Sequence, residues 1–583
     1  MRVAQSHREG IVFMNAAPTA HGGSIVNLMA DDERAGELKR LSRDFCSMTL
    51  STAAAYDLEL LMNGAFSPLT GFMGRDDYDA VLSRMRLQND CLWPLPVCLP
   101  INSILARQIE PGQSLALRDA EGFMLAVLHV QDIWRIDKER EAQQIFCSRD
   151  VRHPGVRRLL ESDADYYAGG PVEGIQFPLH AAFKSLRNSP MEMRQRFKKL
   201  GWRKIVGYQP QGLMHRAEFE MTLRVMAQTK ACLLLHPVIV TAMPGDIDNH
   251  TRIHCYLAAG KNYPANMMQL NLMPLAMRMA GPREALLQAI IQKNYGCTHV
   301  IVEPDHASPK PNADGLPFYR KEAAAEMVAS LRHELGIEIV ACEEMRYIVE
   351  EDVYLPVSEI PAGVQTRHIN NDEFHSKLRN SRKIPEWFTF PEVVDVIQQA
   401  YPPRHKQGFT LFFTGLSGAG KSTIARILYA RLLEMRSRPV TLLDGDIVRR
   451  NLSSELGFSK EHRDLNVKRI GFVASEITKN RGIAICAPIA PYSSTRKYIR
   501  GIIEQYGGFI EIHVATPLSV CESRDRKGLY AKARAGLIRE FTGVSDPYET
   551  PEAPEVCIDT TDMTPDEAVQ EVLLYMERSG YMR

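Results

Sequence analysis

The stretch Gly415-Leu-Ser-Gly-Ala-Gly-Lys-Ser422 decides the fold of the last part of the chain. It fits the pattern G-x-x-x-x-G-K-[ST], follows the apolar run 409–413 and precedes the helical pattern 423–431. A strand, a glycine-rich loop and a helix in this order form a P-loop, in which backbone N–H groups and the helix dipole hold phosphate oxygens. A glycine-rich turn without a ligand is the alternative, and the flanking strand and helix argue against it.

The residues of this loop predict ATP and Mg²⁺ as ligands. Lys421 is expected to reach the β- and γ-phosphates, and the Ser422 hydroxyl is expected to hold Mg²⁺. The residues expected to contact ATP are Gly415, Ser417, Gly418, Ala419, Gly420, Lys421, Ser422 and Thr423.

The composition limits the class of protein. A chain of 583 residues is too long for one core and predicts about three or four domains. Lys and Arg together number 70, as do Asp and Glu, so we expect no general attraction to nucleic acid or to an anionic membrane. The 11 cysteines form no C-x-x-C pair, which favours a reducing compartment over a zinc ribbon or a disulfide framework. Without a long apolar run or a signal peptide, the protein is expected to be soluble and cytoplasmic.

Changes of pattern along the chain predict an α/β multidomain protein. Residues 1–173 predict a β-rich domain, in which the polar residues 1 to about 40 are expected to form a loosely ordered arm. The turn 119–122 between two alternating stretches predicts a hairpin.

The middle of the chain has a different pattern. Residues 174–395 alternate strands with helices and predict a parallel sheet with ligands at the carboxyl ends of its strands. Residues 330–395 are expected to form a small α/β appendage of this domain. Residues 396–408 predict a linker, and residues 409–583 have the size of one further domain.

Acidic residues after the P-loop suggest catalytic chemistry. An apolar strand that starts at Val440 is expected to end in Asp444-Gly-Asp446. Carboxylates at this place suit Mg²⁺ coordination or deprotonation of an acceptor hydroxyl, and a solvated turn is the alternative.

Polar residues farther along predict a second ligand. Arg449, Arg463 and Asn466 can hold an anionic, planar molecule, although each alone is more typical of a surface side chain. The segment 521–530 carries many charges and a glycine, and we expect it to form a mobile lid that excludes water.

Several short motifs of the C-terminal region occur together. They are Gly415–Ser422, Asp444–Arg449, Leu456–Ser459, Arg463–Asn466, Pro491-Tyr492, Lys527–Tyr530 and Phe541–Gly543. With these motifs, residues 409 to about 580 resemble adenylyl-sulfate (APS) kinase. The resemblance implies transfer of the γ-phosphate of ATP to the 3′-hydroxyl of APS, which gives 3′-phosphoadenosine 5′-phosphosulfate (PAPS).

The resemblance also implies roles for single residues. Lys421, Asp446 and Lys527 are implied to be catalytic, with Asp446 as the base or, together with Ser422, as a metal ligand. The residues implied to hold APS are Asp444, Arg449, Phe458, Arg463, Asn466 and Lys527.

Two positions depart from the APS kinase pattern. His462 stands where the family usually has an acid, and Ala490 stands where many members have a phosphorylatable serine. Without that hydroxyl, no phosphoserine is expected to take part.

Longer runs characterise the residues before the linker. They are Ala20–Ser24, Leu61–Met73, Trp93–Pro96, Ala280–Glu284 and Lys293–His299. With these runs, residues 18–395 resemble ATP sulfurylase (sulfate adenylyltransferase), and the whole chain resembles a fusion of the PAPS synthetase type. The resemblance implies a PUA-like N-terminal domain, a Rossmann-like nucleotidyltransferase domain and a P-loop kinase domain. It further implies ATP and APS as small-molecule partners and a homo-oligomer, either a dimer or larger.

The sulfurylase active-site motifs are altered in this chain. The family reads Q-x-R-N-P-x-H-x-x-H, whereas residues 209–218 read Gln-Pro-Gln-Gly-Leu-Met-His-Arg-Ala-Glu. The family's G-R-D-H-A-G corresponds to Glu-Pro-Asp-His-Ala-Ser at 303–308. The residues of this altered site are Gln209, Gln211, Gly212, His215, Glu218, Asp305 and His306.

These changes disfavour a reaction that brings sulfate against the α-phosphate of ATP. Relative to the family, Gln211 and Pro304 replace arginines, and Glu218 and Glu303 add carboxylates. One like charge at ~4 Å costs on the order of 4 kcal/mol at an effective dielectric of about 20. Loss of one transition-state donor costs about 3 kcal/mol. We therefore expect a sulfurylase domain that is inactive or severely weakened and serves as a scaffold or dimerisation element.

Other interpretations stay open. Arg216 or Arg283 could replace the lost positive charge. The protein could be a fully bifunctional PAPS synthetase, or its kinase-like domain could only bind PAPS as a regulator. The intact Lys421 and Lys527, together with Ser422 and Asp446, argue against the regulatory interpretation.

Overall fold

The computed structural model describes most of the chain in two compact units. The described residues are 18–210, 212–239, 247–312, 314–379, 382–457, 459–525, 527–538 and 540–582, without the side chains of Asn371, Asp372, His375, Arg379 and Asp446. Gln211, Phe458 and the side chain of Asp446 therefore lie outside the described part. The larger unit comprises the residues up to 368 with 385–396, and the smaller unit comprises 369–384 with the residues from 397 onward.

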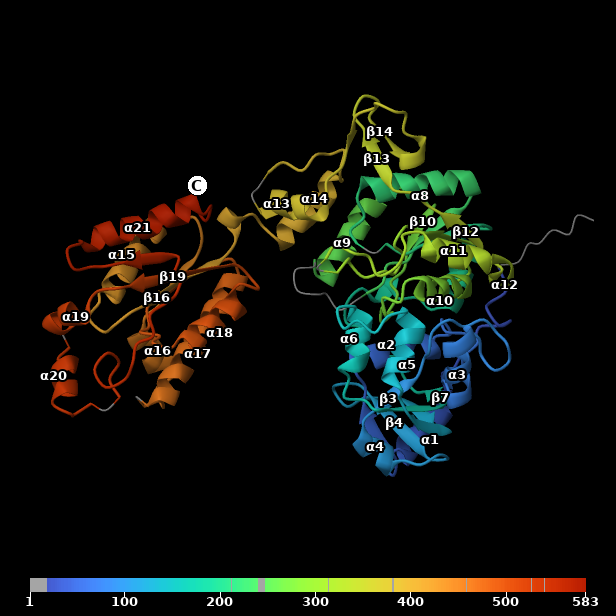
Figure 1. Cartoon of the computed structure of the whole chain (residues 1–583), viewed down its shortest axis with the longest axis horizontal. Helices are drawn as coiled ribbons and strands as arrows, with labels where there is room; N and C mark the ends of the chain where they lie inside the picture. The colour runs from blue at the N-terminus through green and yellow to red at the C-terminus, as the bar shows by residue number, and fades with distance from the viewer. Residues whose placement is uncertain are drawn as a thin grey trace, which may run out of the picture. The chain divides into compact units, whose positions relative to one another are not determined.

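The first part of the larger unit is built around a seven-stranded sheet (blue to cyan in Figure 1). Its elements are α1 (Asp32–Leu41), β1 (Cys46–Thr49), α2 (Thr52–Met62), β2 (Gly71–Phe72), α3 (Arg75–Arg84), β3 (Leu99–Ile101), α4 (Ser103–Gln108), β4 (Ser114–Arg118), β5 (Met124–His129), β6 (Asp132–Arg135), α5 (Lys138–Phe146), α6 (Pro154–Leu160) and β7 (Tyr166–Gly174). The order is β1-β4-β5-β7-β2, and β3 and β6 also pair with the long strand β7. β4 and β5 are antiparallel around the turn 119–122, which confirms the predicted hairpin.

The prediction of a loosely ordered N-terminal arm is wrong for the part that is described. α1 forms there, and the Asp31 side chain caps it by accepting a hydrogen bond from the Arg34 N–H. Acidic residues in its first turn and basic residues in its last turn suit the helix dipole. Upstream, His21 is buried and its N–H donates to Asn294 Oδ1 over 2.8 Å. The cap and the charge order, and not apolar periodicity, are the signals of this helix.

The second part of the larger unit contains a five-stranded sheet and a small three-stranded sheet. Its elements are the 3₁₀ turn η1 (Lys184–Leu186), α7 (Pro190–Lys199), β8 (Ile205–Tyr208), α8 (Arg216–Thr229), β9 (Cys232–Leu235), α9 (Asn249–Gly260), β10 (Met268–Leu270), α10 (Pro282–Asn294), β11 (His299–Val302), α11 (Ala323–Ser330), α12 (Arg332–Leu335), β12 (Glu338–Ala341), β13 (Met345–Ile348), β14 (Val353–Pro356), η2 (Val357–Glu359) and β15 (Thr366–Arg367).

The five-stranded sheet has the order β10-β9-β8-β11-β12, and all its neighbours are parallel, as predicted. β8 and β11 lie side by side, so the residues after Tyr208 and Val302 meet at the carboxyl edge of the sheet, where ligands of such sheets bind. β13, β14 and β15 form the antiparallel three-stranded sheet.

The two parts of the larger unit share one hydrophobic core. A single cluster of buried apolar side chains extends from Leu50 to Ile337. The Asn294 amide at the end of α10 donates to the carbonyls of Ala65 and Ser67, both over 3.0 Å. This shared core fixes the sheet edge that carries the altered motifs.

The smaller unit is a parallel sheet between helices (orange to red in Figure 1). Its elements, with the two helices before it, are α13 (Asn371–Arg379), α14 (Pro391–Ala400), η3 (Arg404–Lys406), β16 (Phe409–Thr414), α15 (Lys421–Glu434), β17 (Val440–Leu443), α16 (Gly445–Leu452), α17 (Lys460–Lys479), β18 (Ile483–Cys486), α18 (Ser493–Ile503), β19 (Gly508–Val514), α19 (Leu518–Arg524), α20 (Leu529–Arg534), β20 (Val556–Ile558) and α21 (Pro565–Arg578). The order is β17-β18-β16-β19-β20. α15 and α21 pack on one face, and α17 and α18 pack on the other.

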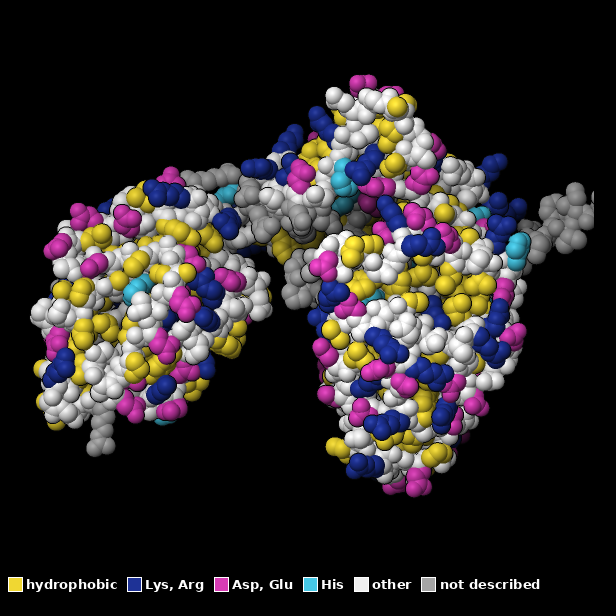
Figure 2. All heavy atoms as spheres, viewed as in Figure 1, with side chains coloured by type: hydrophobic (Ala, Val, Ile, Leu, Met, Phe, Trp, Pro, Cys, Tyr) yellow, Lys and Arg dark blue, Asp and Glu magenta, His cyan; other side chains and the backbone are white. Residues whose placement is uncertain are grey.

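The surface mixes charges of both signs. On the visible face of each unit, Lys and Arg side chains alternate with Asp and Glu side chains (Figure 2). In the part of the chain that the structure describes, no helix has the length and apolar composition needed to cross a membrane.

Candidate functional site

The P-loop of the smaller unit joins β16 to α15. Gly415, Gly418 and Gly420 have φ values of 145°, 77° and 104°. A residue with a side chain would be strained in this backbone conformation. A Cβ at Gly415 would also lie 2.5 Å from the Val514 carbonyl oxygen. The strand, the glycine-dependent loop and the helix confirm the predicted P-loop fold.

Lys421 is the first residue of α15, and its ammonium group contacts the P-loop backbone. Its Nζ donates to the carbonyl oxygens of Gly415 over 2.9 Å and of Leu416 over 2.7 Å. Burial, followed by the nearby Lys527, lowers the pKa of Lys421 to about 8, although Cys521 acts in the opposite direction. An anionic phosphate at this place would favour the charged ammonium.

The other residues expected to contact ATP have different surroundings. Ser422 and Thr423 are exposed at the start of α15. The Ser417 carbonyl accepts a hydrogen bond from Tyr530, and the Ala419 carbonyl accepts from the Thr516 hydroxyl. The described residues contain no cluster of three or more His, Cys, Asp or Glu that could hold a metal ion. A metal at Ser422 would therefore depend on phosphate oxygens and on Asp446, whose side chain is not described.

The acidic pair after β17 differs from the sequence expectation. β17 ends at Leu443, and α16 starts at Gly445, so that Asp446 belongs to the first turn of a helix and not to a strand end. Asp444 is buried, and its Oδ2 accepts a hydrogen bond from Arg426 over 3.4 Å. The helix forms here because the carbonyl of Asp444 already accepts from the Val448 N–H.

Arg449 and His462 both hold the loop before Phe458. Arg449 Nη1 donates to the carbonyls of Leu456 and Gly457 over 3.2 and 2.9 Å. His462 Nδ1 accepts from the Gly457 N–H over 2.9 Å. The histidine thus fixes the loop backbone at the position where the APS kinase pattern has an acid.

Arg463 of α17 belongs to a compact polar group that the sequence did not reveal. Its guanidinium donates to Thr542 Oγ1 over 2.7 Å, to Asp546 Oδ2 over 2.9 Å and to the Tyr492 hydroxyl over 3.2 Å. The Tyr492 hydroxyl also donates to Asp546 Oδ2 over 2.8 Å. Tyr492 and Asp546 lie 29 and 83 residues from Arg463 in the sequence, so no local pattern could predict these contacts.

Asn466 lies one turn after Arg463 on α17. It is buried, and its Oδ1 has no hydrogen-bond partner among the described residues. A cavity of about 600 Å³ is lined by Leu416 of the P-loop and by the loop after Thr542, with Gly543, Val544, Ser545, Asp546, Pro547 and Tyr548. A pocket that joins the P-loop to the Arg463 group suits a second ligand next to ATP.

The predicted lid consists of two short helices. Between α19 and α20, Lys527 is exposed, and Gly528 has a φ of 63° that only glycine adopts easily. Tyr530 is 1% exposed, and its hydroxyl donates to the Ser417 carbonyl over 2.8 Å. The lid is thus fastened to the P-loop three residues after Lys527.

The altered motif of the larger unit follows β8. Gln209 is buried, and its Nε2 lies 3.8 Å from the Met273 sulfur. The carbonyl of Gly212 accepts from the Tyr256 hydroxyl over 2.5 Å. His215 caps α8, and its N–H donates to Glu218 Oε2 over 2.9 Å in a capping box.

A second carboxylate meets this edge from β11. Glu303 Oε1 accepts from the Tyr208 hydroxyl over 2.9 Å. Burial, followed by the negative charge of Glu218, raises the pKa of Glu303 to about 7, and burial also raises the pKa of Glu218. The edge therefore holds two carboxyl groups that disfavour each other's charged form and any further anion.

The remaining residues of the second motif have structural contacts. His306 Nε2 lies 2.6 Å from Gln288 Oε1 on α10, and burial lowers the pKa of His306 to about 4. Asp305 is exposed with a φ of 58°, and its N–H donates to the Lys321 carbonyl over 3.0 Å.

Arg216 and Arg283, the two candidates to replace the lost arginines, already bind other groups. The Arg283 guanidinium donates to the backbone carbonyls of Val81, Leu82 and Pro94. Arg216 donates to the Glu386 carbonyl over 2.9 Å, and its guanidinium lies over the Phe390 ring at 4.6 Å.

Comparisons with known proteins identify the domains of this chain. Family models match as a PUA-like domain at residues 18–177, ATP-sulfurylase at 184–400 and adenylylsulphate kinase at 407–559. The chain is 44% identical over 570 residues to a sulfate adenylyltransferase of Chaetomium globosum, a match that covers 97% of this chain and 99% of the relative. The chain belongs to the sulfate adenylyltransferase family.

Other proteins are also similar to nearly the whole chain. A sulfate adenylyltransferase of Neurospora crassa is 44% identical over 566 residues, covering 96% of this chain and 99% of the relative. A solved structure described as a hexameric APS kinase from Thiobacillus denitrificans has a TM-score of 0.79 and 40% identity, and covers 98% of this chain and 100% of its own. This sulfate adenylyltransferase family member thus carries an ATP-sulfurylase domain and an APS kinase domain in one chain, as the resemblances implied.

Proposed function

We propose that this protein is an APS kinase whose ATP-sulfurylase domain no longer catalyses its own reaction. The kinase proposal rests on one observation above all. Leu416 of the P-loop and Asp546, the ion-pair partner of Arg463, line the same cavity. ATP would bind at the P-loop, and the anionic adenosine phosphosulfate would bind beside Arg463.

The proposed transfer is a direct displacement. The 3′-hydroxyl oxygen of APS attacks the γ-phosphorus of ATP, the bond to the β–γ bridging oxygen breaks, and ADP leaves. Asp446 is the proposed acceptor of the hydroxyl proton or a ligand of Mg²⁺ with Ser422. Mg²⁺ would neutralise phosphate charge, while Lys421 orients the phosphates and Lys527 helps the lid exclude water.

The remaining proposed APS contacts follow the family pattern. Asp444 and Arg449 would contact APS, and Asn466 Oδ1 would accept a hydrogen bond from it. Phe458 is proposed as an APS contact from the resemblance alone. Incubating the full chain with APS and MgATP and quantifying PAPS tests this part, since absence of PAPS would refute it.

The loss of sulfurylase catalysis rests on the carboxyl pair Glu218 and Glu303. Both groups occupy the sheet edge that must accept sulfate beside three phosphates, and Arg216 and Arg283 are engaged elsewhere. The triple variant with Gln211→Arg, Gly212→Asn and Glu218→His should recover at most partial sulfurylase activity, because Pro304 still replaces the arginine of the second motif. Formation of APS from ATP and sulfate by the wild-type chain at a meaningful rate would contradict the proposal.

A fully bifunctional PAPS synthetase is the second candidate function. It is favoured by the 44% identity to sulfate adenylyltransferases over nearly the whole chain. We further propose a homo-oligomer, because the solved relative of similar length is described as hexameric. We propose a cytoplasmic location because the 11 cysteines form no C-x-x-C pair, which favours a reducing compartment.

A further inference from the structure

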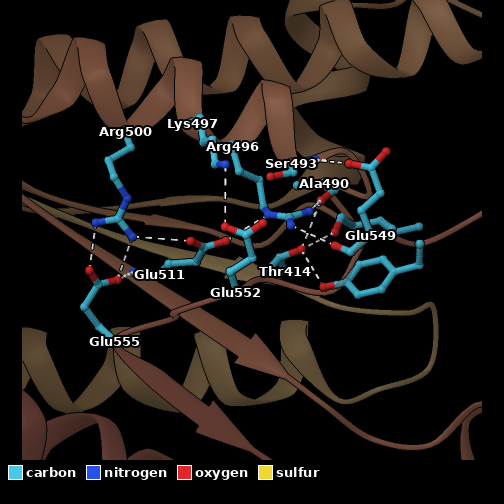
Figure 3. A network of polar contacts seen from close by, with 12 residues as sticks. Thr414, Ala490, Ser493, Arg496, Lys497, Arg500, Glu511, Glu549, Glu552 and Glu555 are labelled. Carbon is cyan, nitrogen blue, oxygen red and sulfur yellow. Dashed lines mark hydrogen bonds and ion pairs between the residues drawn. The ribbon is translucent and has the colours of Figure 1, made fainter.

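Arg496 is an almost completely buried arginine of α18 that the proposed mechanism does not use. It is 3% exposed, and its Nε lies 2.9 Å from Glu511 Oε1 on β19. Its Nη1 donates to the Ala490 carbonyl over 2.8 Å, and its Nη2 donates to the Glu549 carbonyl over 2.7 Å. Figure 3 shows the guanidinium between these partners.

The two carbonyls belong to loops that are also bonded to each other. The Glu549 N–H donates to the Pro491 carbonyl over 2.9 Å, and the Ser493 N–H donates to Glu549 Oε2 over 2.6 Å. From the sheet side, the Thr414 hydroxyl donates to the Ala490 carbonyl over 3.1 Å, directly before the P-loop.

These same loops supply the partners of Arg463. Tyr492 lies two residues after Ala490, and Asp546 lies three residues before Glu549. Both side chains bond to Arg463 and to each other. The Arg496 guanidinium is therefore connected, through the short segments 490–492 and 546–549, to the side chains that contact Arg463.

Burying a charge is costly unless each donor finds an acceptor. Arg496 meets this condition because its planar fork of N–H groups reaches one carboxylate and two carbonyls in different directions. A lysine ammonium places its donors on one atom and cannot span the same three partners.

We propose that Arg496 is a positioning residue for the acceptor substrate: by holding the Ala490 and Glu549 loops together, it keeps Tyr492 and Asp546 in the places that orient Arg463 toward APS. This inference rests on the proposed APS kinase function. It predicts that Arg496 affects APS far more than ATP, although it touches neither.

Arg500 provides a matched control on the same helix. It shares Glu511, with Nη2 3.3 Å from Oε2, and pairs with Glu555 at 2.7 Å. Its ion pairs are with Glu504, Glu511 and Glu555. Arg500→Lys therefore weakens the carboxylate network that Arg496 shares, but it removes no hydrogen bond to the Ala490 or Glu549 carbonyl.

The test compares Arg496→Lys and Arg500→Lys in the full chain by measuring kcat, the KM for APS, the KM for MgATP and the melting temperature. Arg496→Lys should raise the KM for APS about tenfold or more while the KM for MgATP changes less than about threefold. Arg500→Lys should lower the melting temperature and leave both KM values within about twofold of the wild type. Equal changes for both substrates, or the same kinetic pattern in both variants, would overturn the inference.

A second variant decides the case in which Arg496→Lys does not fold. Glu549 is exposed, and Glu549→Ala removes only the carboxylate that accepts from the Ser493 N–H. It should fold and raise the KM for APS about threefold with an unchanged KM for MgATP. An unchanged KM for APS would overturn the inference, whereas a wild type that makes no PAPS would instead refute the proposed function.

Discussion

The Tyr208 hydroxyl donates to Glu303 Oε1 over 2.9 Å, at the point where the parallel strands β8 and β11 end side by side. Burial and the neighbouring Glu218 raise the pKa of Glu303 to about 7 from an ordinary value of 4.5. The sheet edge that carries the altered motifs thus holds a buried carboxyl group with a raised pKa.

Glu303→Gln should alter the pH dependence of stability. The folded protein holds the Glu303 proton more tightly than the unfolded chain does, so protonation of Glu303 contributes to the free energy of unfolding of the wild type. This contribution is fully present below pH 4.5 and is lost as the pH rises through about 7. At about pH 8 the variant should exceed the wild type by about 2 kcal/mol in free energy of unfolding, and at about pH 5 the two should agree closely. Denaturant unfolding at both pH values measures the difference.

The control for this prediction is Glu338→Gln, which changes an exposed carboxyl at the start of β12 and should leave the pH profile unchanged. Burial also raises the pKa of Glu141 to about 7, but this residue is unchanged in the wild type and in both variants, so it does not affect the comparison. Parallel pH profiles for Glu303→Gln and wild type would show that Glu303 is not the group responsible.

Much of the fold followed from local sequence. The P-loop could be predicted because a strand, glycines with φ above zero and a helix start occupy one short segment, 409–431. The parallel sheet around β8 and β11 followed from alternating strand and helix patterns. The helix α1 was missed because its signals are a cap and charges, which apolar periodicity does not detect.

The site was less predictable. Arg463 could be singled out as a polar residue near a P-loop, but its partners Thr542 and Asp546 lie 79 and 83 residues away. The helical position of Asp446 depends on the hydrogen bond from the Val448 N–H to the Asp444 carbonyl. The apolar pattern of the preceding strand does not reveal this bond. Contacts made only by tertiary folding leave no trace in one sequence.

Lys421→Ala should abolish PAPS formation by the full chain. The variant loses the ammonium that contacts the P-loop backbone, and the rate should fall by about a hundredfold or more. Lys497→Ala is the matched control, because Lys497 is an exposed lysine paired loosely with Glu552 at 3.7 Å. A Lys421→Ala protein as active as the control would refute the assignment of Lys421.

The kinase should work without a phosphorylated intermediate on the protein. Ala490 is buried with a φ of 45° and has no hydroxyl to accept phosphate. Intact-mass measurement after incubation with MgATP should show unmodified protein. A phosphorylated residue within 488–496 whose phosphate passes on to PAPS would contradict this expectation.

Arg463→Ala should weaken APS binding more than ATP binding. The change removes the guanidinium and leaves Asp546 without its ion-pair partner, so the KM for APS should rise about tenfold or more. The KM for MgATP should stay within about threefold, because the P-loop holds the triphosphate. Lys479→Ala at the other end of α17 is the control. Equal loss for both substrates would show that Arg463 does not act preferentially on the acceptor.

The most direct measurement assays the two half-reactions separately with the unmodified full chain. One assay supplies APS and MgATP and quantifies PAPS, and the other supplies APS and pyrophosphate and quantifies ATP. Glu218 and Glu303 at the altered sheet edge, and an intact P-loop with Lys421, predict PAPS in the first assay and no meaningful ATP in the second. Robust pyrophosphate-dependent formation of ATP would contradict the account and favour a bifunctional PAPS synthetase.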